Sequence, residues 1–234
     1  MPPPPLAGGA GPYSILSIAG FELLPCFSTA EARTLRLVCS EFLGAVTSFP
    51  WMDKKTPIRD LAMWRTCFPS ARAAKIVRTS GHTDADFVHL ANLHYLDMFL
   101  CYQSSITDKA FVHLRGIHTL NMSGCHQPTI TDLAFASLRG IHTLLMSSSS
   151  ANISDAAFVH LRGVQELNIS WCGYSAITDL AFTHLAGIHT LNMNFCDQIG
   201  ITAAAFAHLR GVKKLTTGGC RAAVVAAAKQ VLAL

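Results

Sequence analysis

Residues 106–125 read ITDKAFVHLRGIHTLNMSGC, and this stretch recurs with small changes through the C-terminal two-thirds of the chain. The copies have a period of 24 residues, and once 23, and they begin at His82, Ile106, Ile130, Ile153, Ile177 and Ile201. A repeat of this length forms one supersecondary unit that buries its apolar face only against its neighbours. The sequence therefore predicts a solenoid.

The first half of each unit has the pattern of a short helix. Thr107 or Asp108 is placed to cap the helix start, and Phe111 and Leu114 form an apolar pair three residues apart. Gly116 then supplies the left-handed residue at which many helices end. The phenylalanine recurs in all six units, whereas the stop residue is Gly in five units and Asn in one.

The second half reads Ile117-x-x-Leu120-x-Met122-x-x-Cys125, which alternates as a strand does and turns Leu120 and Met122 inward. This half resembles the leucine-rich repeats, in particular the subclass with Cys at the ninth position of the motif. That position is Ser once and otherwise cysteine: Cys101, Cys125, Cys172, Cys196 and Cys220. The resemblance covers residues 69–234. It implies an α/β leucine-rich-repeat solenoid, with a curved parallel sheet and short helices on its convex side.

Residues 13–55 do not fit the repeat and have the apolar spacing of two or three short helices, with a possible capping box from Ser28 to Glu31. Their second half resembles an F-box, although the usual Leu-Pro opening is absent. The resemblance implies docking to the adaptor of a cullin-type ubiquitin ligase, through apolar residues that include Leu23, Leu24, Leu35, Val38 and Phe42. The alternative is a helical cap that shields the first repeat.

These patterns divide the chain into five parts. Residues 1–12 are rich in Pro and Gly and are expected to form a disordered tail, followed by the F-box-like segment 13–55. A joint and a degenerate first repeat occupy 56–80, leucine-rich repeats occupy 81–221, and the Ala/Val-rich residues 222–234 are expected to form a capping helix. No run of about 20 apolar residues and no secretory signal occurs, so we expect no membrane partner and a cytoplasmic or nuclear protein.

Charge is unevenly distributed along the chain. The formal net charge is +4, but residues 1–80 hold nine Lys and Arg against five Asp and Glu, whereas residues 81–234 hold nine of each. Phosphate-driven binding needs a clustered positive face, which a balanced array does not suggest. Nucleic acid is therefore not an expected partner.

Histidine and cysteine are abundant, yet their positions argue against metal binding and catalysis. Nine of the eleven histidines fall in two repeat columns, which should point in parallel, whereas metal ligands converge on one ion. Five cysteines also share one column, whereas a nucleophile needs one special environment. The recurring aspartates at the helix starts suit the helix dipole. We expect no catalytic residues, no metal site and no cofactor.

Positions that recur build the coil, so positions that vary are free to carry specificity. The outward strand positions are mostly small and polar, with aromatic residues near the strand ends, which is typical of a protein-binding surface. We expect a protein partner on this concave face, bound by Tyr95, Asp97, Phe99, Tyr102, Asn121, Asn168, Trp171, Asn192 and Phe195.

The expected function is that of a protein-interaction module. With the F-box resemblance, the chain would be the substrate-recognition subunit of a cullin-type (SCF) ubiquitin ligase, with the target on the repeats and the adaptor on the helical segment. The alternative is a scaffold or inhibitor protein unconnected with ubiquitin, whose N-terminal helices only cap the solenoid.

Overall fold

A computed structural model describes residues 24–37, 40–76, 78, 80–149, 152–172 and 176–232. The expected tail at 1–12, the first part of the F-box-like segment, and two expected adaptor-facing residues, Leu23 and Val38, lie outside the described residues. Within the described ranges, no helix is both long and apolar enough to cross a membrane.

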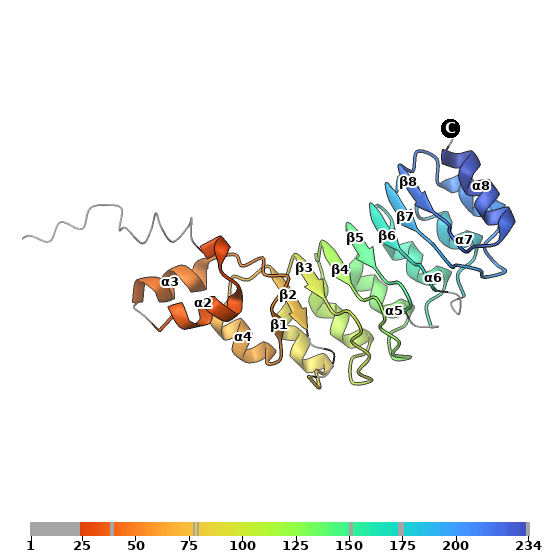
Figure 1. The fold of residues 1–234 in the computed structure, drawn as a ribbon. Coiled ribbons are helices and arrows are strands. Elements are labelled where there is room, and N and C mark those ends of the chain that lie inside the picture. The colour runs from red at the N-terminus through yellow and green to blue at the C-terminus, as the bar shows by residue number, and fades with distance from the viewer. Residues whose placement is uncertain are drawn as a thin grey trace, which may run out of the picture.

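One parallel sheet of eight strands runs along the array, with the strands in chain order (Figure 1). Its register places equivalent repeat positions side by side, so that Leu120 pairs with Leu96 on one side and Leu144 on the other. The sequence did not predict β1, a two-residue edge strand of the kind that tolerates proline. The strands are β1 (Pro57–Ile58), β2 (Ala73–Ile76), β3 (Tyr95–Asp97), β4 (Thr119–Asn121), β5 (Thr143–Leu145), β6 (Glu166–Asn168), β7 (Thr190–Asn192) and β8 (Lys214–Thr216).

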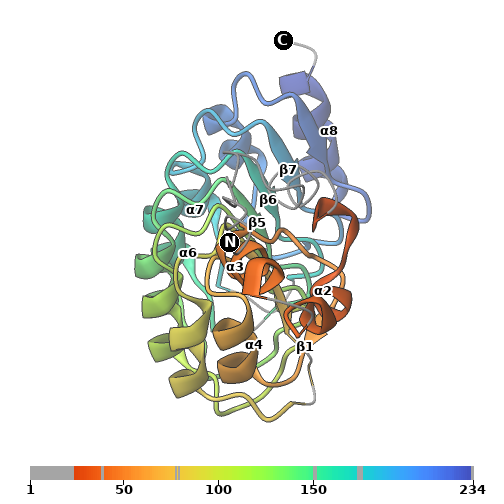
Figure 2. The ribbon, with the colours of Figure 1, turned by 90° about the vertical axis from the view of Figure 1, so that its left-hand side faces the viewer.

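Short helices line the other side of the sheet, as the view along the array shows (Figure 2). Most contain 3₁₀ turns, which are common where a helix has room for only about two turns. The repeat helices are η2 (Asp84–Leu90), η3 (Asp108–Leu114), α5 (Asp132–Phe135), η4 (Ala136–Leu138), α6 (Asp155–Phe158), η5 (Val159–Leu161), α7 (Asp179–Phe182) and η6 (Ala203–His208). The flanking helices are η1 (Leu24–Cys26), α2 (Thr29–Leu35), α3 (Ser40–Ser48), α4 (Leu61–Cys67) and α8 (Ala222–Leu232).

Each expected repeat column has its expected place in the core. Phe111 and Leu114 are buried between helix and sheet, and Leu120 is buried beneath the strand. The stop residues have left-handed backbone angles, with φ of 79° at Gly116 and 62° at Asn92. Apolar burial is the dominant stabilising term in such a fold. The apolar residues that recur in the sequence are therefore the residues that form the core.

The cysteine column ties each unit to the preceding one. The Cys125 thiol donates to the carbonyl oxygen of Met98 at 3.3 Å, and the other repeat cysteines from Cys172 onward make the same kind of bond. Where serine replaces cysteine, the Ser149 hydroxyl donates to the Met122 carbonyl oxygen at 3.1 Å. Burial raises the pKa of the thiols, to about 11 for Cys172. These are structural thiols.

The aspartate column has a second role that the helix dipole does not explain. The Asp155 carboxylate reaches the next unit, where it accepts a hydrogen bond from the Thr178 backbone N–H at 2.7 Å and one from the Thr178 hydroxyl at 2.6 Å. Equivalent pairs of bonds occur at five successive junctions, from Asp84, Asp108, Asp132, Asp155 and Asp179. The column is therefore a ladder between repeats.

The N-terminal helices pack on the first repeat as part of one core. The Trp51 indole N–H donates to the Val46 carbonyl oxygen at 2.8 Å, and both Trp51 and Trp64 are buried. The Asp53 carboxylate accepts from the backbone N–H and the hydroxyl of Thr29. Burial raises the pKa of Asp53, but hydrogen bonds from Thr56 and then Thr29 outweigh it and lower the pKa to about 2.

The C-terminal residues form the expected helix over the last repeat. Val224 and Ala228 of α8 are buried, and Val231 packs against the same core. Arg221 precedes the helix and donates to the carbonyl oxygens of Gln198, Ile199 and Ile201. The aspartate ladder ends before this point, because Ala203 replaces the aspartate in the sixth unit.

Candidate partner-binding face

The outward side chains of the strands form a polar concave face. Three expected partner-binding residues share one role here, because each side-chain oxygen accepts a hydrogen bond at 3.0 to 3.1 Å from the backbone N–H two residues on: Asn121, Asn168 and Asn192. These bonds bend the chain at the strand end. Within the described residues, the amide nitrogens of Asn168 and Asn192 donate to no protein group, so they remain available to a partner.

Asp97 has a more internal position than the sequence suggested. Its side chain is buried, it forms an ion pair with Lys75 at 3.1 Å, and it accepts from the Asn121 amide and the Phe99 backbone N–H. These contacts tie β2, β3 and β4 together. A buried charge that is already paired has little to offer a partner.

A hollow of about 270 Å³ lies on the concave face between β5 and β8. Leu145, Asn168, Asn192 and Lys214 are among the residues that line it. Its volume is at the lower limit of cavities that enclose small molecules. The face therefore suits a protein surface better than an enclosed ligand.

A column of left-handed residues follows the strands, one position before the cysteine column. Two of its members are Gly124 and Gly219, for which a positive φ costs little. The same conformation is held by four larger residues with φ between 51° and 61°: Leu100, Ser148, Trp171 and Phe195. Each costs about 1 kcal/mol or more relative to glycine. The backbone imposes this geometry, since the N–H of Trp171 donates to the Asn194 carbonyl oxygen of the next unit at 2.9 Å.

Trp171 and Phe195 form an exposed aromatic stack at this strained turn. Their rings lie face to face with centroids 3.9 Å apart and an interplanar angle of 17°. The two side chains are nevertheless 58% and 44% exposed. Phe195 also lies over Gly219, where an added Cβ would come within 2.3 Å of its ring. Because glycine fills this position in other units, the fold does not need these aromatic residues.

A second aromatic group lies at the opposite end of the concave face. Phe99 and Tyr102 are half exposed, whereas Tyr95 is more covered. Cations approach both tyrosines, with Arg78 at 5.6 Å from the Tyr102 ring centroid and Lys54 at 4.5 Å from that of Tyr95. Burial, and then nearby Asp97, raises the pKa of Tyr95. Tyr95 thus contacts the segment that precedes β1.

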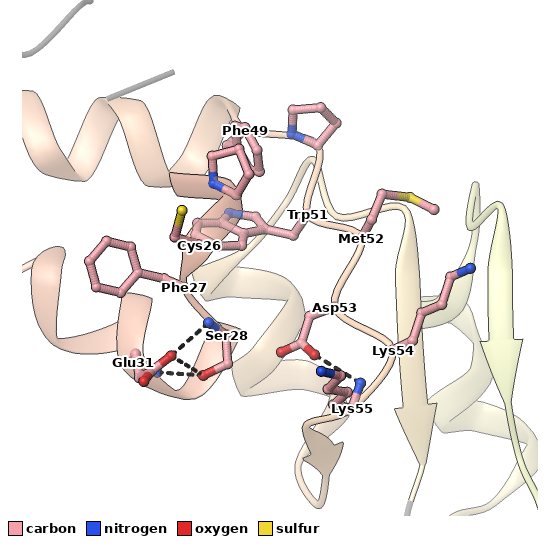
Figure 3. Close-up of a pocket in the computed structure, with 12 residues that line it drawn as sticks. Cys26, Phe27, Ser28, Glu31, Phe49, Trp51, Met52, Asp53, Lys54 and Lys55 are labelled. Atoms are coloured by element: carbon pink, nitrogen blue, oxygen red, sulfur yellow. Dashed lines mark hydrogen bonds between the residues drawn. The ribbon is translucent and has the colours of Figure 1, made fainter. Parts of the chain in front are cut away.

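A cavity of about 760 Å³ lies between residues 25–31, which include the start of α2, and residues 49–55 (Figure 3). Phe27 and Cys26 lie on one side, and Trp51 and Met52 lie on the other. The predicted capping box lies at its lower edge, where the Ser28 N–H and hydroxyl both donate to the Glu31 carboxylate. The sequence did not single out this cavity.

The three expected adaptor-facing residues that the structure describes differ in their exposure. Leu24 is buried in the core, Leu35 is half-buried against it, and Phe42 is partly exposed. Among the described residues of this segment the most exposed large apolar side chain is Leu37, and Met52, Leu43 and Phe27 are also exposed. A surface for an adaptor could therefore include Leu37, which the sequence pattern did not select.

The described residues offer no obvious reaction centre. No group of three or more His, Cys, Asp or Glu within them is arranged to hold a metal ion. The histidine column stacks in parallel, with the ring centroids of His94, His118 and His142 4.3 and 4.4 Å apart. Stacked rings present their edges in one direction and do not converge on a point.

The fold and the concave face define a leucine-rich-repeat solenoid. No family model matches the sequence, and no curated protein matches it. Solved structures do match the fold. A chain of the TLR13–ssRNA13 complex has a TM-score of 0.53 and 17% identity, covering 70% of this chain and 23% of that one.

A chain of the glycosylated Toll–Spatzle complex, described as a hub in Drosophila development and innate immunity, has a TM-score of 0.54 and 11% identity. The match covers 80% of this chain and 30% of that one. This protein therefore spans less than a third of the length of either matched chain. At such low identity the likeness shows a shared fold.

Proposed function

We propose that this protein captures a partner protein on its concave face, with the stack of Trp171 and Phe195 as the principal anchor. The observation that carries the proposal is the strained backbone at both residues. Strained positions cluster where function requires them, and glycine would relieve the strain at either position. Exposed Trp and Phe rings also supply the large apolar area from which hot spots are built.

The polar surroundings of the stack support a specific contact. The neighbouring outward positions are amides and hydroxyls, including Asn168 and Asn192, which can form hydrogen bonds at the edge of an apolar anchor. An aromatic centre within a polar border is the usual arrangement of a protein interface. The few charges on this face, such as Glu166 and Lys214, would help to select the partner.

The test compares proteins captured by the wild type and by Trp171→Ala/Phe195→Ala, identified by mass spectrometry. A matched control is Leu133→Ala/Leu180→Ala, which removes exposed apolar side chains from α5 and α7 on the helical side. We expect the wild type and the control to capture the same protein, and the aromatic variant to lose it. Equal capture by all three would reject the proposal.

A second proposal concerns the N-terminal helices. We infer that they dock a ubiquitin-ligase adaptor, so that the captured protein would be a substrate for a cullin-type ligase. Leu37 and Leu43, which are 87% and 40% exposed, favour a docking role over that of a simple cap. Burial of these side chains against an adaptor would stabilise the complex.

Co-purification with the adaptor and the cullin tests this second proposal. Leu37→Ala/Leu43→Ala should lose both proteins, whereas Trp171→Ala/Phe195→Ala should retain them. Neither exposed leucine supports the core, so the variant should keep its thermal stability. Absence of both ligase proteins from the wild-type complex would leave the ubiquitin-independent scaffold as the function.

A further inference from the structure

The six segments that join each repeat helix to the next strand lie side by side along one edge of the solenoid. We call this the basic edge, and it comprises residues 88–95, 112–119, 136–143, 159–166, 183–190 and 207–214. Backbone bonds hold the segments together, since the His118 N–H donates to the His94 carbonyl oxygen and the His142 N–H donates to that of His118. Any side chain that recurs in these segments is therefore repeated along a line.

Positive charge accumulates on this edge. Four exposed arginines occupy the same position in different units, and exposed lysines follow in the last one: Arg115, Arg139, Arg162, Arg210, Lys213 and Lys214. All six segments are described, and Glu166 is their only carboxylate. Nine of the eleven histidines also lie here or in the adjoining helix ends. Five of the nine carboxylates in residues 81–234 belong instead to the aspartate ladder at the helix starts.

Among the residues that the structure describes, these arginines form no ion pair with a carboxylate. Arg139 and Arg162 donate to the imidazole Nδ1 of His160 and His184 in the following units, at 3.2 and 3.3 Å. A neutral imidazole orients a guanidinium but does not neutralise it. The positive charges therefore remain open to an anion in solution.

A hollow of about 660 Å³ extends the basic edge at its N-terminal end. Arg65 and Arg72 line it together with Ser48, Val88 and Asn92, and no carboxylate is among the lining residues. Burial, and then the positive charge of Arg72, lowers the pKa of Arg65. Its guanidinium is held in place by backbone carbonyl oxygens, with the closest bond at 2.6 Å to His89. Two neighbouring guanidinium groups without a counterion would favour an anion here.

We propose that the basic edge binds an acidic protein segment in which apolar residues are interspersed. Charge complementarity requires an anion, and the exposed side chains beside the arginines indicate its type. Val88, Val112 and Val159 are 50%, 47% and 43% exposed and recur one position before the helix-end histidines. Valine can pack against apolar side chains, whereas nucleic-acid bases stack on aromatic rings, and the only Phe, Trp or Tyr in these six segments is Tyr95. The basic edge adjoins the concave face and meets it at the first residue of each strand, such as Lys214, whereas its arginines and valines lie before the strands.

Fluorescence anisotropy with the full chain tests this inference, using a labelled peptide of repeating Glu-Glu-Val-Ser units. A Glu-Glu-Ser-Ser peptide of the same length removes the apolar part, and an oligouridylate of that length provides the nucleic-acid comparison. We expect the valine-containing peptide to bind most tightly, and its binding to weaken with salt. Tighter binding of the oligouridylate, or no binding of the valine-containing peptide at low salt, would overturn the proposal.

Variants locate the site. Arg115→Gln/Arg139→Gln/Arg162→Gln should weaken peptide binding about tenfold, since three exposed ion pairs together amount to that factor. A charge-matched control, Arg33→Gln/Lys109→Gln/Lys229→Gln, neutralises exposed residues elsewhere and should bind as the wild type does. Equal weakening by both sets would mean that only net charge matters and would refute the site. Trp171→Ala/Phe195→Ala should leave peptide binding unchanged, which separates this inference from the proposed function.

Discussion

Replacing Asp155 with Ala should destabilise the array by breaking one rung of the aspartate ladder. The substitution removes two short hydrogen bonds, at 2.7 and 2.6 Å, from Thr178 to a carboxylate. Bonds to a charged group contribute about 1.5 kcal/mol or more each, so we expect a loss of about 3 kcal/mol. For a chain of this size, that corresponds to a decrease in Tm of about 6 to 12 °C.

Urea and thermal denaturation, followed by circular dichroism, measure this loss. Asp155→Asn is a matched variant, because its amide can still exchange hydrogen bonds with the Thr178 hydroxyl while the charge is removed, so it should lose less than Asp155→Ala. Asp197→Ala, an exposed carboxylate outside the ladder, should change the free energy of unfolding by less than about 0.5 kcal/mol. A loss for Asp155→Ala no larger than that of Asp197→Ala would refute the structural role of the ladder.

Three further predictions concern other parts of the molecule. Under native conditions an alkylating reagent should label the exposed Cys26 but spare the buried repeat thiols, because burial raises their pKa values. Labelled repeat cysteines in mass spectrometry would contradict this. Because the pKa of Asp53 is about 2 in the folded protein, below its ordinary 3.8, its stabilising contribution should be lost as the pH falls from about 4 to 2. Asp53→Asn should reduce this pH dependence of stability, measured by tryptophan fluorescence. An unchanged pH profile would argue against the role of Asp53. Gly219→Ala places a Cβ against the Phe195 ring at a positive φ, so it should lower stability by about 1 kcal/mol or more and weaken partner capture, whereas a neutral effect on both would show that the turn can relax.

Much of the fold was predictable because each repeat column performs one physical task. The phenylalanine, leucine and glycine columns predicted the buried helix face, the inward strand face and the helix stop, and Phe111, Leu120 and Gly116 take these positions. Six equivalent strands in register follow from near-identical units. β1 was not predictable in this way, because its two residues belong to no repeat and are placed by pairing with β2.

The properties of the candidate sites were less predictable than the fold, because they depend on contacts between units. The sequence singled out Trp171 and Phe195, but not their strained backbone, although the glycines in the same column at positions 124 and 219 carried that signal. The burial of Asp97 depends on Lys75 in the neighbouring strand, which repeat comparison does not reveal. Likewise, a count of charges showed balanced repeats, whereas the fold places arginines and aspartates on different parts of each unit.

The central claim is that the aromatic stack serves binding and not folding. The most direct test is to measure thermal stability and partner capture on the same preparation of Trp171→Gly/Phe195→Gly. Glycine relieves the left-handed strain at both positions, and this gain should offset the lost stacking, which is worth about 0.5 to 1.5 kcal/mol. We predict an unchanged or higher Tm together with loss of the captured partner. A large decrease in Tm with capture retained by the folded fraction would contradict the account.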